Sequence, residues 1–270
     1  MLRRLAAAIA AVTITAVTSA LPAAAARNDD GSPEARYRAC MTLVDVDSQL
    51  AWETALEWRK KGGGDPAGHC AAAAAFALGR FVDAAEGLEA LAASARRKDG
   101  LGNRREARPG DGVLRASLWA QAAHAWLSAD QPERAERAAG EAMSLAPRDP
   151  GPLLLRARAL AAQQRFAEAS TDLDRAIALD SKLADAYVFR ASALRRQRGY
   201  DRAAADLAAA LALDPGHPEA LLERGILRRL QGDDAGARAD WTALLATAPK
   251  SPAAEQARLN LEKMKMDQGG

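Results

Sequence analysis

The sequence of 270 residues is poor in the side chains from which catalytic and metal sites are built. It has three histidines and two cysteines, and aromatic residues make up 4% of the chain. It contains no H-E-x-x-H or C-x-x-C motif, no P-loop and no nucleophile elbow. Gly100-Leu101-Gly102 lacks the third glycine and the preceding strand of a dinucleotide-binding loop. We therefore predict a protein that is not an enzyme and that holds no metal ion or cofactor.

Long apolar runs are also absent, except at the N-terminus. There, Arg3-Arg4 precedes an uncharged stretch from Leu5 to Leu21, and Ala24-Ala25-Ala26 follows, which is the order of a secretory signal peptide with its cleavage site. The stretch is nearly long enough to be a membrane anchor. It is rich in alanine and threonine rather than leucine, so cleavage after Ala26 is favoured. Residues 1–26 are predicted to be removed, which leaves a periplasmic or secreted protein that is not inserted in a membrane.

An excess of charge of one sign is missing as well. The chain has 37 basic and 35 acidic side chains. Removing Arg3 and Arg4 with the signal peptide leaves 35 of each, so the net charge of the mature chain is formally zero. A nucleic-acid-binding protein is expected to carry a basic face with a net positive charge. The charge balance therefore gives no support for a nucleic-acid partner.

What the sequence does contain is an internal repeat with a period of 34 residues. Its four units are residues 116–149, 150–183, 184–217 and 218–251. The same residue types return in the same columns of each unit. Large residues share one column and small residues share two others: Trp119, Leu153, Tyr187 and Leu221; Ala123, Ala157, Ala191 and Gly225; Ala135, Ala169, Ala203 and Ala237.

Each unit is predicted to be a pair of antiparallel helices. In the first half of a unit, apolar residues fall at i, i+4 and i+7, as in Trp119, Ala123 and Trp126, which is one stripe of an α-helix. The second half repeats this spacing and ends before a proline in three of the units. Short polar turns such as residues 198–201 separate the halves, and such turns join antiparallel neighbours. The fold class is therefore all-α.

The large residue, the small residue four positions later, the paired alanines and the closing Asp214-Pro215 resemble the tetratricopeptide repeat (TPR), whose repeat has this length. Residues 184–217 match that pattern most closely. Ser181, Arg228 and Leu244 depart from it. The resemblance implies an α-solenoid, a right-handed superhelix of stacked antiparallel hairpins, rather than an ordinary helical bundle. It also implies an extended concave surface on which another polypeptide binds.

The segments that flank the four units have weaker patterns. Residues 27–95 are predicted to form an N-terminal helical cap with a degenerate TPR-like hairpin, and residues 252–266 a helix that covers the last unit. Residues 96–115 contain glycine and clustered arginines, which predicts a basic flexible loop or, alternatively, an attachment point for an anionic partner. Residues 267–270 are expected to be frayed.

The two cysteines are expected to pair. Cys40 lies in a predicted helix over residues 33–44, and Cys70 in a helix that opens at Asp65-Pro66, with Asp65 as its cap. A third helix, over residues 48–61, lies between them, and alternate helices of a stacked array are neighbours. Export to an oxidising compartment favours a structural disulfide. A redox-active pair is the alternative, but the two cysteines lack the close spacing that such pairs have.

The units also carry matched charges. Arginine and aspartate occupy two fixed columns in the last three units, and both columns hold alanine, Ala122 and Ala138, in the first unit. Because the charges are present or absent together, we predict structural ion pairs, within one hairpin or between adjacent hairpins. These residues are Arg156 with Asp172, Arg190 with Asp206, and Arg224 with Asp240. His69, at a helix start, and His217, in a turn between units, are expected to be surface residues rather than ligands.

The remaining face of the first helices is predicted to be the partner-binding groove. Its floor is apolar with arginines along it, which suits a peptide with apolar and acidic side chains. TPR proteins that clamp a C-terminal carboxylate use a lysine and asparagine set, which these helices lack. The predicted groove residues are Gln121, His124, Leu154, Arg158, Val188, Phe189, Ser192, Arg195, Arg196, Leu222, Ile226 and Arg229.

Two functions agree with this interpretation. The first is an exported TPR scaffold or adaptor that joins proteins in a bacterial envelope complex through its concave groove. The alternative is a periplasmic holdase-type chaperone that uses the same groove for unfolded exported chains. An adaptor selects one or two folded partners, whereas a chaperone protects unrelated ones.

Overall fold

The computed structural model describes residues 32–100 and 111–268 of the chain. Within these ranges the structure consists of 13 α-helices and contains no strand. The predicted all-α fold class is confirmed. The helices are α1 (Pro33–Val46), α2 (Ser48–Lys60), α3 (Gly64–Ala77), α4 (Phe81–Gly100), α5 (Asp111–Ser128), α6 (Pro132–Leu145), α7 (Gly151–Ala162), α8 (Phe166–Leu179), α9 (Ala184–Arg196), α10 (Tyr200–Leu213), α11 (Pro218–Leu230), α12 (Asp234–Thr247) and α13 (Pro252–Gln268).

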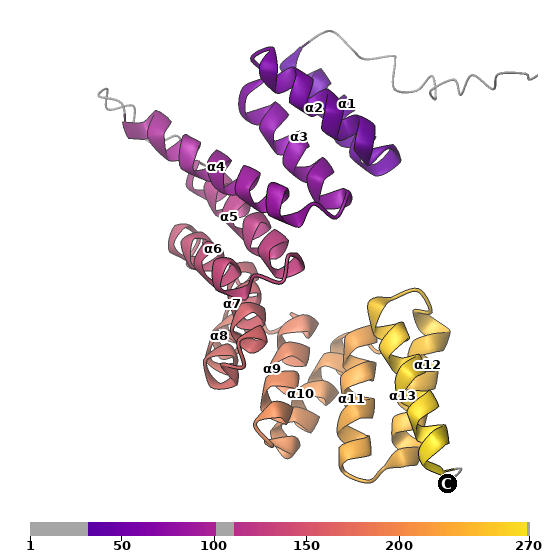
Figure 1. Cartoon of the computed structure of the whole chain (residues 1–270). Coiled ribbons are helices and arrows are strands. Elements are labelled where there is room, and N and C mark those ends of the chain that lie inside the picture. The colour runs from indigo at the N-terminus through magenta and orange to yellow at the C-terminus, as the bar shows by residue number, and fades with distance from the viewer. Residues whose placement is uncertain (1–31, 101–110, 269–270) are drawn as a thin grey trace, which may run out of the picture.

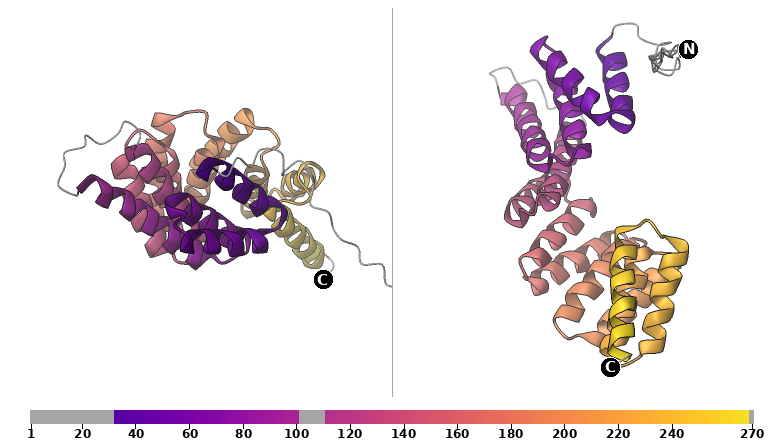
Figure 2. Two further views of the ribbon diagram at one scale, coloured as in Figure 1. Left: turned by 90° about the horizontal axis from the view of Figure 1, so that it is seen from above. Right: turned by 45° about the vertical axis from the view of Figure 1, so that its right-hand side comes forward.

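The helices stack in chain order into a curved array (Figure 1). Each helix contacts the next one, and contacts also join α5 to α7, α7 to α9, α9 to α11 and α11 to α13. The array bends at α6 to α8, so that α1 to α3 and α11 to α13 lie at its two ends and face the same side in Figure 1 (Figures 1 and 2). The contacts between consecutive odd-numbered helices place these helices on the inside of the bend.

The small-residue columns explain the close pairing of helices. Ala135, Ala169, Ala203 and Ala237 have no exposed surface, and each lies in the second helix of a hairpin. A methyl group at these positions lets two helix backbones approach, and larger residues then fill the space between hairpins. In the last unit a larger residue on α12 faces a smaller one on α11. Trp241 stands in a column that holds leucine in the two preceding units. Gly225 replaces alanine opposite it, and a Cβ atom at Gly225 would overlap the Trp241 ring.

The turns inside the hairpins share one backbone conformation. Asp130, Gln164 and Arg198 have positive φ angles of 54°, 61° and 63°, and Gly232, in the same column, has a φ of 86°. Glycine adopts this left-handed region without the steric cost that a side chain imposes. The left-handed conformation therefore recurs at the same position of every unit, and this position holds glycine only in the last unit.

The structure corrects several boundaries. Residues 96–100 belong to α4 and residues 111–115 to α5, so these parts of the predicted basic loop are helical, because both helices extend beyond the region where the repeat pattern holds. Residues 101–110, the rest of that loop, lie outside the described residues, as does the predicted signal peptide. Helix α13 runs to Gln268, beyond the predicted end at residue 266. The N-cap of α3 is Gly63 and not Asp65, which lies in the first turn.

A disulfide joins Cys40 of α1 to Cys70 of α3, with a distance of 6.2 Å between their Cα atoms. Both cysteines are buried. Helices α1 and α3 contact each other directly, which is the neighbour relation expected from alternate helices of a stack. The bond therefore ties the first helix to the rest of the array.

None of the helices in the described residues is long and apolar enough to cross a membrane. The described residues also contain no cluster of three or more metal-ligating side chains.

Candidate functional site

The candidate site is the surface that faces the inside of the bend. It is formed by the solvent-facing side chains of α3, α5, α7, α9 and α11, and we call it the inner face. Solenoid proteins use such concave surfaces because successive hairpins present side chains side by side over a long distance. The chemistry of the inner face changes along its length, and its three regions are described in turn.

The middle of the inner face carries a row of aromatic and basic side chains, which we call the central stripe: Phe76, His124, Arg158 and Phe189. They come from α3, α5, α7 and α9. The rings of Phe76 and His124 lie 5.1 Å apart, and the guanidinium of Arg158 lies 5.5 Å from the centre of the Phe189 ring. Burial, and then the nearby charge of Arg158, lower the pKa of His124, which keeps the imidazole neutral at pH 7. Arg158 is exposed, so its guanidinium is available to a carboxylate.

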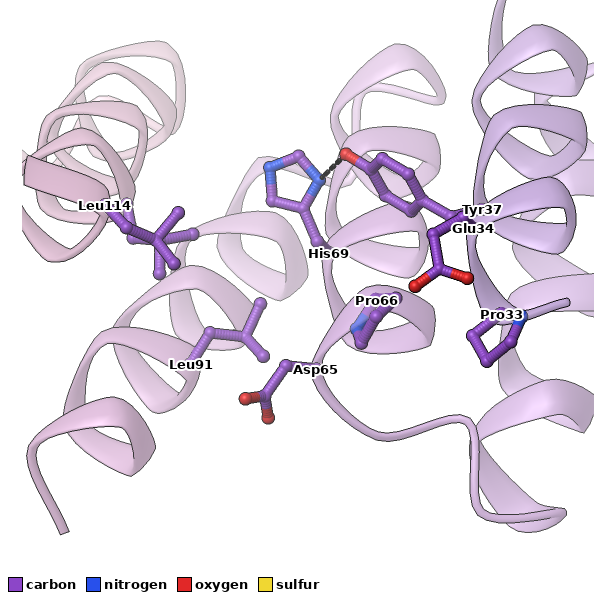
Figure 3. A pocket seen from close by; sticks show the side chains of 9 residues that line it. Pro33, Glu34, Tyr37, Asp65, Pro66, His69, Leu91 and Leu114 are labelled. Carbon is purple, nitrogen blue, oxygen red and sulfur yellow. Dashed lines mark hydrogen bonds between the residues drawn. The ribbon is translucent and has the colours of Figure 1, made fainter. Parts of the chain in front are cut away.

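The N-terminal region carries a chain of hydrogen bonds across three helices. Tyr37 of α1 donates to Nδ1 of His69 on α3, with a separation of 2.9 Å (Figure 3). On its other side, Nε2 of His69 lies 3.2 Å from Oε1 of Gln121 on α5. A neutral imidazole protonated at Nε2 satisfies both bonds, accepting from Tyr37 and donating to Gln121. Burial raises the pKa of Tyr37, so the phenol keeps the proton that it donates.

The C-terminal region differs from the sequence prediction, because its arginines are occupied by carboxylates of the same chain. Arg195 of α9 makes two hydrogen bonds to Glu223 of α11, of 2.8 and 3.2 Å, and both side chains are 16% exposed. Ser192 also hydrogen-bonds Glu223, and Arg229 pairs with Asp267 of α13. These arginines join neighbouring hairpins to one another. The sequence analysis did not predict these ion pairs, because helix phase fixes the side on which a residue lies but not the charge on the next hairpin.

The apolar residues assigned to the groove are less accessible than predicted. Val188 is 2% exposed and belongs to the core, so its assignment to the groove was wrong. Leu154, Leu222 and Ile226 are half-buried and pack against the cores beneath them. Arg196 is exposed, but its guanidinium lies 5.3 Å from the ring of Phe166, on the preceding hairpin.

Comparisons with known proteins identify the fold. No protein-family model and no curated protein matched the sequence. A tetratricopeptide repeat protein from Parabacteroides merdae has a similar structure, with a TM-score of 0.63 and 13% identity over 87% of each chain. A thermophilic TPR protein from Thermus thermophilus gives a TM-score of 0.59 at 18% identity, covering 75% of this chain and 100% of its own. The C-terminal part of a TPR repeat-containing protein from Cytophaga hutchinsonii gives 0.55 at 15%, covering 85% and 88%. The chain has the tetratricopeptide-repeat fold.

The three predicted ion pairs lie inside hairpins of this TPR array. Arg156 and Asp172 make hydrogen bonds of 2.6 and 2.5 Å, Arg190 and Asp206 of 2.8 and 2.6 Å, and Arg224 and Asp240 of 3.0 and 2.7 Å. Each pair joins the two helices of one hairpin, which decides between the two arrangements that the sequence left open. The aspartates are buried, with exposed fractions of 2, 6 and 3%. Hydrogen bonding to Asp206 is the main cause that raises the pKa of Arg190.

Arg228, which departs from the TPR pattern, has an explanation in this arrangement. It occupies a column that is otherwise apolar, and its guanidinium lies 2.8 Å from the carboxylate of Asp240. The buried Asp240 therefore receives hydrogen bonds from two arginines. This arginine joins the two helices of the last hairpin.

His217 is another residue whose position the sequence misjudged. It is 8% exposed, and its Nε2 lies 3.0 Å from the carboxylate of Asp185, in the first turn of α9 at the start of the same unit. Its Nδ1 accepts a 3.4 Å hydrogen bond from the backbone N–H of Ala220 and thereby caps α11. The turn between units is solvent-facing in general, but this side chain folds back between two hairpins.

Phe76 is the member of the central stripe that the sequence analysis missed. It lies in the degenerate hairpin, where the repeat columns are difficult to align, so its phase could not be compared with that of the four units. A signal was present, because Phe76 is one of the few aromatic residues of the chain and lies in a run of alanines.

Proposed function

We propose that this protein is a TPR scaffold or adaptor, and that the inner face binds a polypeptide segment with acidic and apolar side chains. The central stripe carries this proposal. It places an exposed guanidinium between aromatic rings contributed by three different hairpins. Aromatic and arginine side chains that lie together on a concave surface are the composition of binding hot spots.

The chemistry of the stripe selects the partner. A guanidinium binds a carboxylate through two parallel hydrogen bonds, and the adjacent Phe189 ring offers an apolar contact for the neighbouring residue. At the C-terminal end, Arg195 and Arg229 are already paired with carboxylates. Arg158 is the exposed arginine of the central stripe, and we therefore propose it as the main contact for an acidic residue.

Export to the bacterial envelope is part of the proposal. The predicted signal peptide and its Ala26 cleavage site support it, and so does the Cys40–Cys70 disulfide, because disulfides persist in oxidising compartments. Intact-mass measurement of the exported protein is expected to give a chain that begins at or near Arg27. A mature protein that retains residues 1–26 would overturn this part of the proposal.

The binding role is tested by charge reversal at one residue. The wild-type protein is crosslinked in envelopes of its source organism, and the captured proteins are identified by mass spectrometry. Arg158→Glu is expected to weaken capture about tenfold or more. The matched control is Arg202→Glu, which reverses an exposed arginine on α10, away from the inner face. Equal loss in both variants, or no loss in either, would contradict the assignment.

A holdase-type chaperone is the second candidate, favoured by the half-buried leucine and isoleucine side chains beneath the inner face. It is tested by light scattering of a chemically denatured, unrelated protein during refolding. Suppression of aggregation at stoichiometric amounts, together with unselective crosslinking, would assign the protein to this class. One or two folded partners captured in fixed proportion would assign it to the adaptor class.

A further inference from the structure

His124 and Arg158 are neighbours on the inner face. They occupy the same column of adjacent repeat units, and this column continues with Ser192 and Ile226 in the next two units. Their helices, α5 and α7, contact each other directly. Both residues are exposed. The column therefore places an imidazole beside a guanidinium on the surface that is open to a partner.

The imidazole of His124 is held in place and is neutral in the free protein. Its ring centre lies 5.1 Å from that of Phe76, and the two ring planes differ by 32°. Burial, and then the charge of Arg158, lower the pKa of His124. The imidazole therefore becomes charged only in acidic solution, and a ligand that alters its surroundings changes its protonation.

Other titratable and charged side chains next to α5 have partners of their own. On α3, His69 hydrogen-bonds Gln121 of α5. On α4, Glu86 and Glu89 make ion pairs with Arg134 of α6. The imidazole on α5 therefore responds mainly to the guanidinium beside it.

The charge of Arg158 is partly compensated from the following hairpin. Hydrogen bonding to His217 is the main cause that lowers the pKa of Asp185, in the first turn of α9, and the charge of Arg158 contributes to the same shift. The guanidinium therefore interacts with a carboxylate on one side and an imidazole on the other. A second positive charge on the imidazole side strengthens the attraction for a carboxylate that arrives from solvent.

We propose that His124 and Arg158 together bind one carboxylate of the partner, and that His124 takes up a proton when the partner binds. The inference rests on the proposed function, because it takes Arg158 to be the contact for an acidic residue. A bound carboxylate offsets the repulsion between guanidinium and imidazolium and attracts the imidazolium itself, so it raises the pKa of His124. By linkage, the protein holds its partner more tightly as pH falls through that raised value.

The proposal is tested by titrating the purified protein with acetyl-Ala-Phe-Glu-Phe-Ala-amide at about pH 5.5 and about pH 7.5. The glutamate of this peptide is largely ionised at both values. Dissociation constants are obtained from NMR shifts of backbone amides on α5 and α7. Binding is expected to be about fivefold tighter at the lower pH, because a rise of about one pH unit in the pKa of His124 limits the gain to about tenfold. Equal affinities at the two pH values, or no binding at the lower one, would overturn the proposal.

Two variants identify the group that takes up the proton. His124→Gln keeps a hydrogen-bonding side chain that carries no charge, and it should remove the difference between the two pH values. The matched control is His217→Gln, which removes the imidazole that hydrogen-bonds Asp185, and it should retain the difference. If His217→Gln removes the pH dependence and His124→Gln retains it, the proton is taken up in the turn between units and the proposal is wrong.

A direct titration of the His124 imidazole by NMR needs no variant. The glutamate peptide should raise its pKa by about one pH unit, whereas acetyl-Ala-Phe-Gln-Phe-Ala-amide should not. An unchanged pKa in the presence of bound glutamate peptide would contradict the proposal.

The proposed function can fail separately. If Arg158→Glu weakens both the peptide and the envelope capture, while binding is the same at both pH values, only the role of His124 is wrong. If neither peptide binding nor capture depends on Arg158, the assignment of the partner site is wrong as well.

Discussion

At the scale of single residues, most charged side chains that helix phase directs inward serve the array itself. Arg190 illustrates this, because it bonds Asp206 in its own hairpin and Asp174 in the preceding one. The first unit lacks such a pair and still folds into a hairpin, with Ala122 and Ala138 in its place. A missing pair is therefore tolerated, whereas removing one member takes away the main partner of a largely buried charge.

Asp206→Ala is accordingly expected to cost about 3 kcal/mol of unfolding free energy, because it leaves the guanidinium of Arg190 poorly compensated. The double variant Arg190→Ala with Asp206→Ala should lose less than the single one, since it reproduces the composition of the first unit. Urea denaturation of the wild type, the two single variants and the double variant measures the difference. Destabilisation in the double variant equal to or greater than that of Asp206→Ala would show that the two residues do not act as a pair.

His217 makes the stability of the array depend on pH. Hydrogen bonding to Asp185 is the main cause that raises its pKa above the ordinary value of 6.5, and the same bond lowers the pKa of Asp185, which therefore stays ionised in mildly acidic solution. A pKa raised in the folded state stabilises the fold below the unfolded pKa, and this contribution is lost as pH rises through the folded pKa.

His217→Gln should therefore lower the unfolding free energy more at about pH 5.5 than at about pH 8.5. Urea denaturation of both proteins at the two pH values provides the comparison. Asp185→Asn should remove the same pH-dependent contribution while leaving the histidine in place. A stability difference that is the same at both pH values would mean that the imidazole acts only as the neutral cap of α11.

At the scale of one hairpin, the last unit shows two columns that change together. The first three units have Ala123, Ala157 and Ala191 where the fourth has Gly225. The opposite column reads Ala139, Leu173, Leu207 and Trp241. Trp241 is 1% exposed and donates a hydrogen bond to the backbone oxygen of Leu222, so its ring occupies the space of the missing methyl group.

Gly225→Ala should therefore destabilise the protein by about 2 kcal/mol, although alanine normally favours a helix. Adding Trp241→Leu recreates the pair that Ala191 and Leu207 form in the preceding unit. The double variant should be more stable than the sum of the two single changes predicts, with a coupling of about 1 kcal/mol or more. Thermal and urea denaturation measure the coupling, and additive effects would show that the ring relaxes away from residue 225.

At the scale of the whole molecule, the sequence predicts the features that recur in every repeat unit. It does not predict the contacts that a side chain makes with an adjacent hairpin. The period, the hairpins and the partners in each ion pair follow from columns that can be compared across units. The pairings of His217 with Asp185 and of Arg195 with Glu223 do not, because each is decided by a side chain on a neighbouring hairpin. Helices α4 and α5 extended into the predicted loop, where no repeat column was available for comparison.

The disulfide lies at one end of the array, so its removal tests how far a local loss of stability spreads. Because each hairpin contacts only its neighbours, the stability of a solenoid is close to a sum of local terms. The Cys40–Cys70 bond closes a loop with a sequence separation of 30 and lies entirely within α1 to α3. In the chain-entropy treatment, removing the bond lowers the unfolding free energy by roughly 3 to 4 kcal/mol. That loss should fall on the N-terminal helices and spare the distant ones.

The double variant Cys40→Ala with Cys70→Ala should therefore increase amide hydrogen exchange in α1, α2 and the start of α3, while α9 to α12 keep their protection. Exchange measured by mass spectrometry on peptides from both ends gives this comparison within one sample. Reduction of the wild-type protein should produce the same pattern, which separates loss of the bond from loss of the sulfur atoms. Faster exchange along the whole array would mean that the hairpins unfold as one cooperative unit, so that a covalent bond at one end stabilises the inner face throughout.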